Sequence, residues 1–104
     1  MRAAPFASIV AFALLVACGT AAAATHAVTI DGMKFQPEEL TVHRGDKITW
    51  NNKDMVPHTV TSAGAFDSGA IAPGKSWSWT AKNPGAHDYV CSYHPTMKAR
   101  VVVK

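Results

Sequence analysis

The segment "HDYVCSYHPTMKARVVVK" at residues 87–104 contains two strand-like runs separated by a short loop. In the first run His87, Tyr89 and Cys91 share one face of an extended chain, because successive side chains of a strand point to opposite sides. The second run, residues 98–104, includes three consecutive valines, which favour a strand. The segment therefore predicts two strands and, between them, the loop "SYHPTM".

The rest of the chain beyond residue 24 has the same character. No segment of a dozen residues keeps the 3.6-residue period of an amphipathic helix, and Gly and Pro recur throughout. Short strand-like runs occur at residues 28–31, 34–35, 40–43, 47–51, 58–61 and 76–80. The sequence predicts an all-β fold, a sandwich or a barrel of about seven short strands.

Two local predictions follow from the turn residues. The tight turn Arg44-Gly45-Asp46 separates the runs at 40–43 and 47–51, which predicts that these runs form a hairpin. Residues 64–74, "GAFDSGAIAPG", are rich in Gly and small residues, which indicates a loop.

Residues 1–24 have the layout of a secretory signal. A basic start precedes the uncharged run "FASIVAFALLVA" at residues 6–17, and small residues follow it. This run is shorter than the roughly 20 residues that span a bilayer, which disfavours a permanent membrane helix. Cleavage after Ala24 would leave residues 25–104 as one exported domain.

A second interpretation of the leader remains open. Residues 15–18, "LVAC", resemble the lipobox of bacterial lipoproteins, in which case residues 1–17 are removed and Cys18 is lipidated. In both cases the predicted location is the periplasm, and a membrane anchor is expected only with lipid on Cys18.

Charge and cysteine content restrict the function further. The exported part has nine Lys and Arg against seven Asp and Glu, without a basic run longer than two residues, so nucleic-acid binding is not expected. It keeps a single cysteine, Cys91. In an oxidising compartment a lone thiol is buried and inert, used to form a dimer, or occupied by a ligand. We expect a monomer, so the neighbours of Cys91 become decisive.

Cys91, His94 and Met97 lie three residues apart and offer a thiol, an imidazole and a thioether. Soft sulfur donors combined with imidazole select copper, and two histidines, one cysteine and a weak axial methionine mark a blue-copper electron-transfer site. The second histidine is His58 in "MVPHTV", 33 residues before Cys91. Singly, each residue more often has a purely structural role; the ordered set of four points to one copper ion.

Other uses of these residues fit less well. Zinc seldom takes a thioether, and a structural zinc site needs four strong ligands. A haem attachment motif Cys-x-x-Cys-His is absent from the sequence. A Cys–His nucleophile pair is chemically conceivable, but no orienting carboxylate is evident near Cys91. The histidine pairs of multicopper oxidases are also absent, so an enzyme with a small-molecule substrate is not expected.

The segments "DYVCSYHPTM" and "VPHTV" resemble the cupredoxin family of blue (type 1) copper proteins. The Cys-x₂-His-x₂-Met spacing is most similar to the amicyanin branch, since plastocyanins have a longer gap before the methionine. The resemblance implies a Greek-key β-sandwich of seven or eight strands over residues 25–104. It also implies His58, Cys91 and His94 as equatorial copper ligands and Met97 as the axial ligand.

By the same resemblance, the protein would shuttle single electrons between redox partners, such as a cytochrome c and a dehydrogenase or oxidase. Storage or delivery of copper is the alternative. Thr59 departs from the asparagine that many members carry after the first histidine, which leaves the contact between the ligand loops in doubt. Exposed neutral residues are predicted to surround His94 and to form a docking surface: Met33, Pro57, Ala72, Pro73, Tyr93 and Pro95.

Three further histidines are not predicted to bind copper in this site. His43 is expected to face solvent, and His87 to lie at the rim of the sandwich. His26 would become the second residue after cleavage at Ala24, where a free amine could make it an adventitious Cu(II) site of low affinity. The three tryptophans, Trp50, Trp77 and Trp79, are expected in the core.

Overall fold

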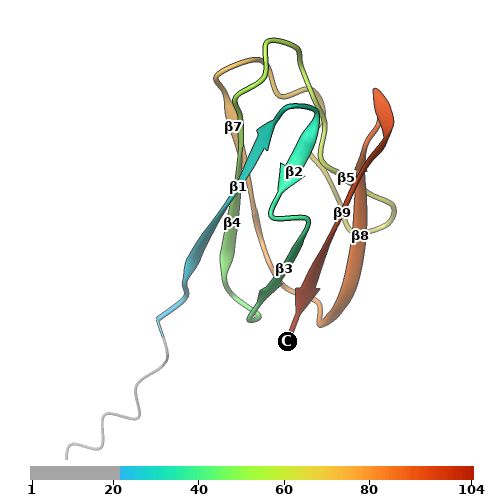
Figure 1. Cartoon of the computed structure of the whole chain (residues 1–104). Helices are drawn as coiled ribbons and strands as arrows, with labels where there is room; N and C mark the ends of the chain where they lie inside the picture. Colours follow the sequence, from blue (N-terminus) through green and yellow to red (C-terminus); the bar gives the residue numbers. More distant parts are fainter. Residues whose placement is uncertain (1–21) are drawn as a thin grey trace, which may run out of the picture.

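The computed structural model describes residues 22–104, and the predicted signal and lipobox segments lie almost entirely outside this range. Nine strands form two sheets within it (Figure 1). The four-stranded sheet has the order β2 (Lys34–Gln36), β1 (Thr25–Asp31), β4 (Lys47–Asn52), β7 (Ser76–Thr80). The five-stranded sheet has the order β3 (Glu39–Val42), β9 (His94–Val103), β8 (Gly85–Cys91), β5 (Thr61–Ser62), β6 (Phe66–Asp67).

The core lies between these sheets. Alternate residues along β4 and β8 are buried, and they include Ile48, Trp50, Tyr89 and Cys91. The indole Nε1–H of Trp50 donates to the Tyr89 hydroxyl at 3.2 Å, so neither polar group is left unpaired. Burial raises the pKa of Tyr89 to about 12, which keeps the hydroxyl protonated. This packing confirms the predicted all-β sandwich.

The other two tryptophans are less buried than expected. Trp77 and Trp79 lie on β7, an edge strand, and are partly buried against the core cluster rather than enclosed by it. Their indoles contact Phe66 with ring centroids 6.1 Å and 4.5 Å apart, respectively. Only Trp50, on a central strand, is fully enclosed.

The hairpin predicted from residues 40–43 and 47–51 is wrong. β3 pairs in parallel with β9, whereas β4 pairs in parallel with β1 and antiparallel with β7, so the two runs belong to different sheets. Gly45, with a φ of 95°, lies in the turn between them. The chain crosses from one sheet to the other between β3 and β4. Val42 of β3 and Ile48 of β4 are both buried in the core between the sheets.

Three strand boundaries also differ from the prediction. The run at 58–61 is not one strand, because His58 makes only an isolated bridge to Ile71 and β5 begins at Thr61. The predicted loop at 64–74 contains β6 and the bridging Ile71. The last strand, β9, begins at His94 rather than at residue 98. The ladder of hydrogen bonds therefore extends to the tip of the β8–β9 hairpin.

The sandwich has two distinct ends. The β1–β2 turn, the loop after β4 and the β8–β9 turn lie together at the upper end in Figure 1, while β1 begins and the chain ends at the lower end. No helix in the part of the chain that the structure describes is long and apolar enough to cross a membrane.

Candidate metal centre

Three side chains that could hold a metal ion, those of His58, Cys91 and His94, meet at the upper end of the sandwich. The Sγ of Cys91 lies 3.7 Å from Nδ1 of His58 and 3.6 Å from Nδ1 of His94. All three donor atoms lie within 4.8 Å of one another. Each histidine thus presents its Nδ1 to the thiol, which places one nitrogen of each ring within reach of a metal ion at Cys91.

The β8–β9 hairpin positions two of these side chains. Cys91 ends β8 and His94 begins β9, and the two residues face each other in the register after an irregularity at Val90/Cys91. A bulge of this kind re-aims side chains at the end of a strand pair. The Cys-x₂-His spacing is therefore the spacing of a tight hairpin tip.

His58 comes from the long connection between β4 and β5. Its backbone N–H donates to Ile71 O at 3.2 Å, and Ile71 N–H donates to His58 O at 2.7 Å. The imidazole has no exposed surface, whereas His94 is partly exposed. His94 is therefore the more accessible of the two histidines.

Met97 is buried in the core, with 5% of its surface exposed, three residues after His94 on β9. Cys91 belongs to the same cluster of buried residues. The role of Met97 as a copper ligand stays a prediction, as does the assignment of the complete four-residue set.

Thr59 provides the contact between the ligand loops that its departure from asparagine placed in doubt. Its Oγ1 accepts the N–H of Ser92 at 2.7 Å, and its own N–H donates to the Cys91 Sγ at 3.3 Å. Thr59 thus joins the His58 loop to the hairpin through two hydrogen bonds.

Two polar residues that sequence reasoning missed support His58. Asp54 Oδ2 lies 2.8 Å from His58 Nε2, and the backbone N–H of Asp54 donates to the Oδ1 of buried Asn52 at 2.9 Å. Desolvation of Asp54 raises its pKa, but hydrogen bonds from Met33, His58 and Gly32 outweigh it, so the pKa lies below its usual value. The carboxylate beside His58 is therefore ionised near neutral pH.

The six residues predicted to form a docking surface around His94 are all exposed, including Met33 (41%) and Tyr93 (52%). Met55 and Val56, which the sequence analysis did not single out, are 92% and 41% exposed. They precede Pro57 and His58 and add exposed apolar side chains to the His58 loop.

The remaining histidines lie apart from this cluster. His87 Nε2 is 2.9 Å from the carbonyl oxygen of Asn83, and the side chain of His43 is 80% exposed. His26 Nε2 lies 2.9 Å from Asp46 Oδ2, at the start of β4 and thus at the lower end. Hydrogen bonds from His26 and from the backbone of His43 and Ala24 lower the pKa of Asp46 to about 2.

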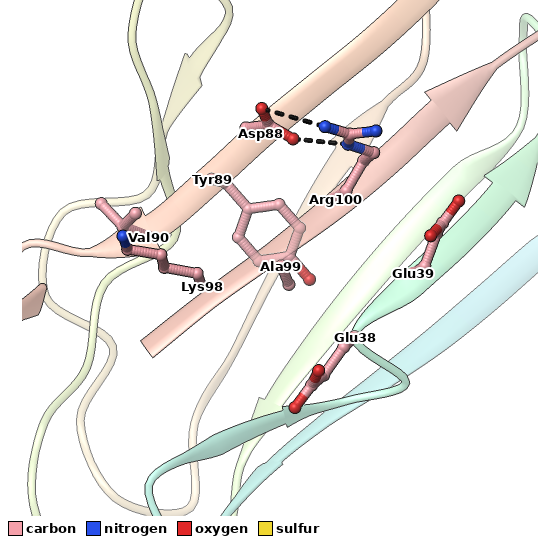
Figure 2. A pocket seen from close by; sticks show the side chains of 8 residues that line it. All are labelled: Glu38, Glu39, Asp88, Tyr89, Val90, Lys98, Ala99 and Arg100. Carbon is pink, nitrogen blue, oxygen red and sulfur yellow. Dashed lines mark hydrogen bonds and ion pairs between the residues drawn. The ribbon is translucent and has the colours of Figure 1, made fainter. Parts of the chain in front are cut away.

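One surface hollow is not lined by any of the three donors. It has a volume of about 610 Å³ and is lined by residues of β8 and β9 together with Glu38 and Glu39. Figure 2 shows that its rim carries the Asp88–Arg100 ion pair, whose shortest contact is 2.6 Å. None of His58, Cys91 and His94 lines it. The hollow is open and charged, without a convergent set of reactive groups.

Comparison with known proteins agrees with this geometry. The Cupredoxin-like domain profile matches residues 5–103. Amicyanin-alpha of Methylorubrum extorquens is 35% identical over 83 residues, which cover 74% of this chain and 70% of the relative. Amicyanin of Paracoccus denitrificans is also 35% identical over 83 residues, covering 74% of this chain and 63% of the relative. A solved structure of a Cu(I) amicyanin variant superposes with a TM-score of 0.73 at 32% identity, covering 77% of this chain and 82% of that one.

The donor set itself is suited to copper. A thiolate and two imidazoles, with a buried thioether on the adjacent strand, are the soft and intermediate ligands that copper prefers. Together with the amicyanin relatives, this donor set confirms the predicted copper cofactor and the prediction that the protein is not an enzyme. The chain belongs to the cupredoxin-like family and is similar to the amicyanins within it.

Proposed function

We propose that this protein is a periplasmic blue-copper carrier that shuttles single electrons between redox proteins, with residues 1–24 serving as its export signal. One observation carries the proposal: the donor atoms of His58, Cys91 and His94 are already gathered, with Cys91 and His58 fully buried and His94 partly exposed. Bound copper supplies a reversible one-electron change between Cu(I) and Cu(II).

The protein contributes a site that moves little. Cys91 Sγ accepts a hydrogen bond from Thr59 N–H, and Thr59 Oγ1 accepts one from Ser92 N–H, so the two ligand segments are cross-linked. His58 is held through its backbone by Ile71 and through Nε2 by Asp54. Because the donors are prearranged, we expect little reorganisation when an electron arrives or leaves.

His94 would provide the path for electrons to a partner. It is the one imidazole of the cluster with exposed surface. The exposed residues Tyr93 and Pro95 flank it in the sequence, and exposed Pro57 precedes His58. Weak redox encounters use small interfaces, and a neutral apolar surface suits them. Partners that donate and accept electrons would dock there in turn.

The Cu(II) protein should be intensely blue, because the Cys91 thiolate donates charge to copper. Cys91→Ser should lose the colour and keep the far-ultraviolet circular dichroism of a folded sandwich. Absorption spectra of both proteins loaded with Cu(II) provide the test. A wild-type protein that binds only zinc, or a Cys91→Ser variant that stays blue, would contradict the site.

Copper delivery is a second candidate, and one observation favours it. Met55 and Met33 expose thioethers on the segments that support His58, and thioethers are soft ligands for Cu(I). A carrier should retain its copper when mixed with a stoichiometric Cu(I) chelator and should exchange electrons rapidly. A delivery protein should instead surrender the metal within minutes.

A further inference from the structure

The turn between β1 and β2 contacts the side chain that orients His58. Gly32 and Met33 form its two central positions, between the paired residues Asp31 and Lys34, and both have left-handed backbones with φ of 61° and 60°. Such φ values at both positions are typical of a tight type I′ hairpin turn. Met33 adopts this conformation despite its side chain, which points to a specific restraint.

That restraint is Asp54. The N–H of Gly32 donates to Asp54 Oδ1 at 2.8 Å, and the N–H of Met33 donates to Asp54 Oδ2 at 3.0 Å. The same Oδ2 lies 2.8 Å from Nε2 of His58. One carboxylate therefore holds two backbone donors of a turn and the outer nitrogen of a histidine.

The position of Asp54 is itself fixed by a buried amide. Asn52 is 1% exposed, and its Oδ1 accepts the backbone N–H of Asp54 at 2.9 Å. Its Nδ2 donates to Val56 O and to Ile71 O, both at 2.9 Å. Because Ile71 also pairs with the backbone of His58, the carboxylate and the imidazole are held by the same residues.

The geometry determines the hydrogen-bonding pattern of the His58 ring. An ionised carboxylate only accepts hydrogen bonds, so Nε2 must carry the proton that it donates to Asp54. The neutral ring then has its lone pair on Nδ1, the atom 3.7 Å from Cys91 Sγ. An outer carboxylate partner also makes the inner nitrogen a stronger electron donor.

Within residues 22–104 no lysine or arginine pairs with Asp54, so the neutral His58 ring is its side-chain partner and its negative charge is not compensated by a cation. The Asp54 side chain is 13% exposed, so water screens its charge incompletely. A negative charge next to a ligand stabilises the more highly charged state of a bound metal ion.

We propose that Asp54 is a positioning residue that links the β1–β2 turn to His58, selects the ring nitrogen that faces the copper ion, and favours the oxidised state of the centre. This inference rests on the proposed function, because it takes His58 as a ligand. It assigns the turn at Gly32 and Met33 to the metal centre through its two backbone N–H groups.

The first experiment uses metal-free protein, so its result does not depend on copper chemistry. Imidazole ¹⁵N shifts of His58 are recorded for the wild type, Asp54→Asn and Asp54→Ala. The wild type should show a single tautomer protonated at Nε2. Asp54→Asn keeps an acceptor oxygen and should retain this tautomer, whereas Asp54→Ala should show a mixture of the two. An unchanged tautomer in Asp54→Ala would overturn the positioning role.

The second experiment measures the reduction potential and the affinities for Cu(II) and Cu(I). Both variants lose the negative charge, so each should weaken Cu(II) binding about 10-fold more than Cu(I) binding. That ratio corresponds to a rise in potential of about 59 mV for a one-electron couple. Asp31→Asn is the matched control, because Asp31 is an exposed carboxylate one residue before the turn. It should leave the potential near that of the wild type.

Two outcomes separate this inference from the proposed function. If the wild type is not blue, the proposed function fails while the tautomer result still stands on its own. If the wild type is blue but Asp54→Ala only accelerates amide exchange at Gly32 and Met33, without a change in tautomer or potential, Asp54 merely caps the turn. That result would overturn the inference and leave the carrier function intact.

Discussion

Two carboxylate–imidazole pairs lie beyond the opposite ends of strand β4, roughly 20 Å apart for a strand of this length. The upper pair is Asp54–His58, with a contact of 2.8 Å, and the lower pair is Asp46–His26, with a contact of 2.9 Å. In the upper pair the histidine is completely buried and the carboxylate is 13% exposed. In the lower pair the histidine side chain is 26% exposed and the carboxylate only 6%.

This reversal of burial distinguishes the upper pair, which belongs to the candidate metal site, from the lower pair, which has a structural role. His58 has a second nitrogen that faces Cys91, so the upper carboxylate acts on a group that is available to a metal ion. Asp46 instead collects three donors, from Ala24 N, His43 N and His26 Nε2, and thereby joins β1 to the turn before β4. Two contacts of nearly equal length thus have different roles, and the surroundings of each histidine determine its role.

The largest difference between the two pairs is expected in Cu(II) affinity, when the histidine of each pair is replaced singly. His58→Ala should weaken Cu(II) binding by at least about 100-fold, since even the loss of an outer partner of a ligand costs 10–100-fold. His26→Ala should bind copper with the affinity of the wild type. Competition titrations with a chelator measure both. Equal losses in the two variants would mean that the lower pair also contributes to the metal site.

The lower pair should instead control stability in acid. The pKa of Asp46 is about 2 in the folded protein against 3.8 as its ordinary value, so its ionised form stabilises the fold above about pH 4. This stabilisation is lost as the pH falls from about 4 to about 2. Asp46→Asn should therefore lower the melting temperature of metal-free protein by a constant amount at higher pH, and this deficit should shrink below pH 4.

A deficit of Asp46→Asn that stays constant down to pH 2 would show that the ionisation of Asp46 is not its cause. The potential of the copper centre should not change in this variant, because the pair lies at the other end of the sandwich.

At the upper end, Thr59 can be tested independently of either pair. Thr59→Val leaves the N–H of Ser92 without its acceptor at 2.7 Å and should reduce the free energy of unfolding by about 1–2 kcal/mol. Thr49→Val is the matched control, since its hydroxyl contacts only Ser78 at an exposed position of the sheet, and about 0.5 kcal/mol or less is expected. Urea unfolding of metal-free protein provides both values; equal losses would argue against a special role for the loop contact.

The smallest effect is predicted for His43. Its side chain is 80% exposed and lies 4.0 Å from Asp46 Oδ2, and its backbone N–H makes the shorter contact at 2.9 Å. His43→Ala keeps that N–H, so the free energy of unfolding should change by less than about 0.5 kcal/mol. A larger decrease in the free energy of unfolding, measured with urea at pH 7, would show that the imidazole itself contributes to the stabilising contacts of Asp46.

The sequence predicted the strands whose side chains alternate, such as β7 with Trp77 and Trp79 and β8 with Tyr89 and Cys91. It also predicted that Cys91 and His94 lie close together, since a hairpin tip brings residues three apart together without long-range information. It could not predict that β3 and β4 enter different sheets, because a Gly-containing turn fits a hairpin and a crossover equally well. The partner strands, β9 and β1, decide the matter.

Asp54 and Asn52 escaped prediction for a related reason. An aspartate shortly after a strand is an ordinary surface residue in a sequence, and its spacing of four from His58 has no meaning outside a helix. Its role arises from the β1–β2 turn, whose N–H groups come from residues more than 20 positions away. Hydrogen bonds of backbone groups leave no signal in residue types.

The hairpin tip at Cys91 and His94 has a consequence for how the protein acquires its metal. These two donors are separated by only two residues, so an unfolded chain can still form a local chelate with them, whereas His58 must arrive across 33 residues. A metal ion that also binds the unfolded chain stabilises the fold by less than its native affinity implies. We therefore expect a copper ion that meets the unfolded chain to bind Cys91 and His94 first, and to gain His58 as a ligand only when the chain folds.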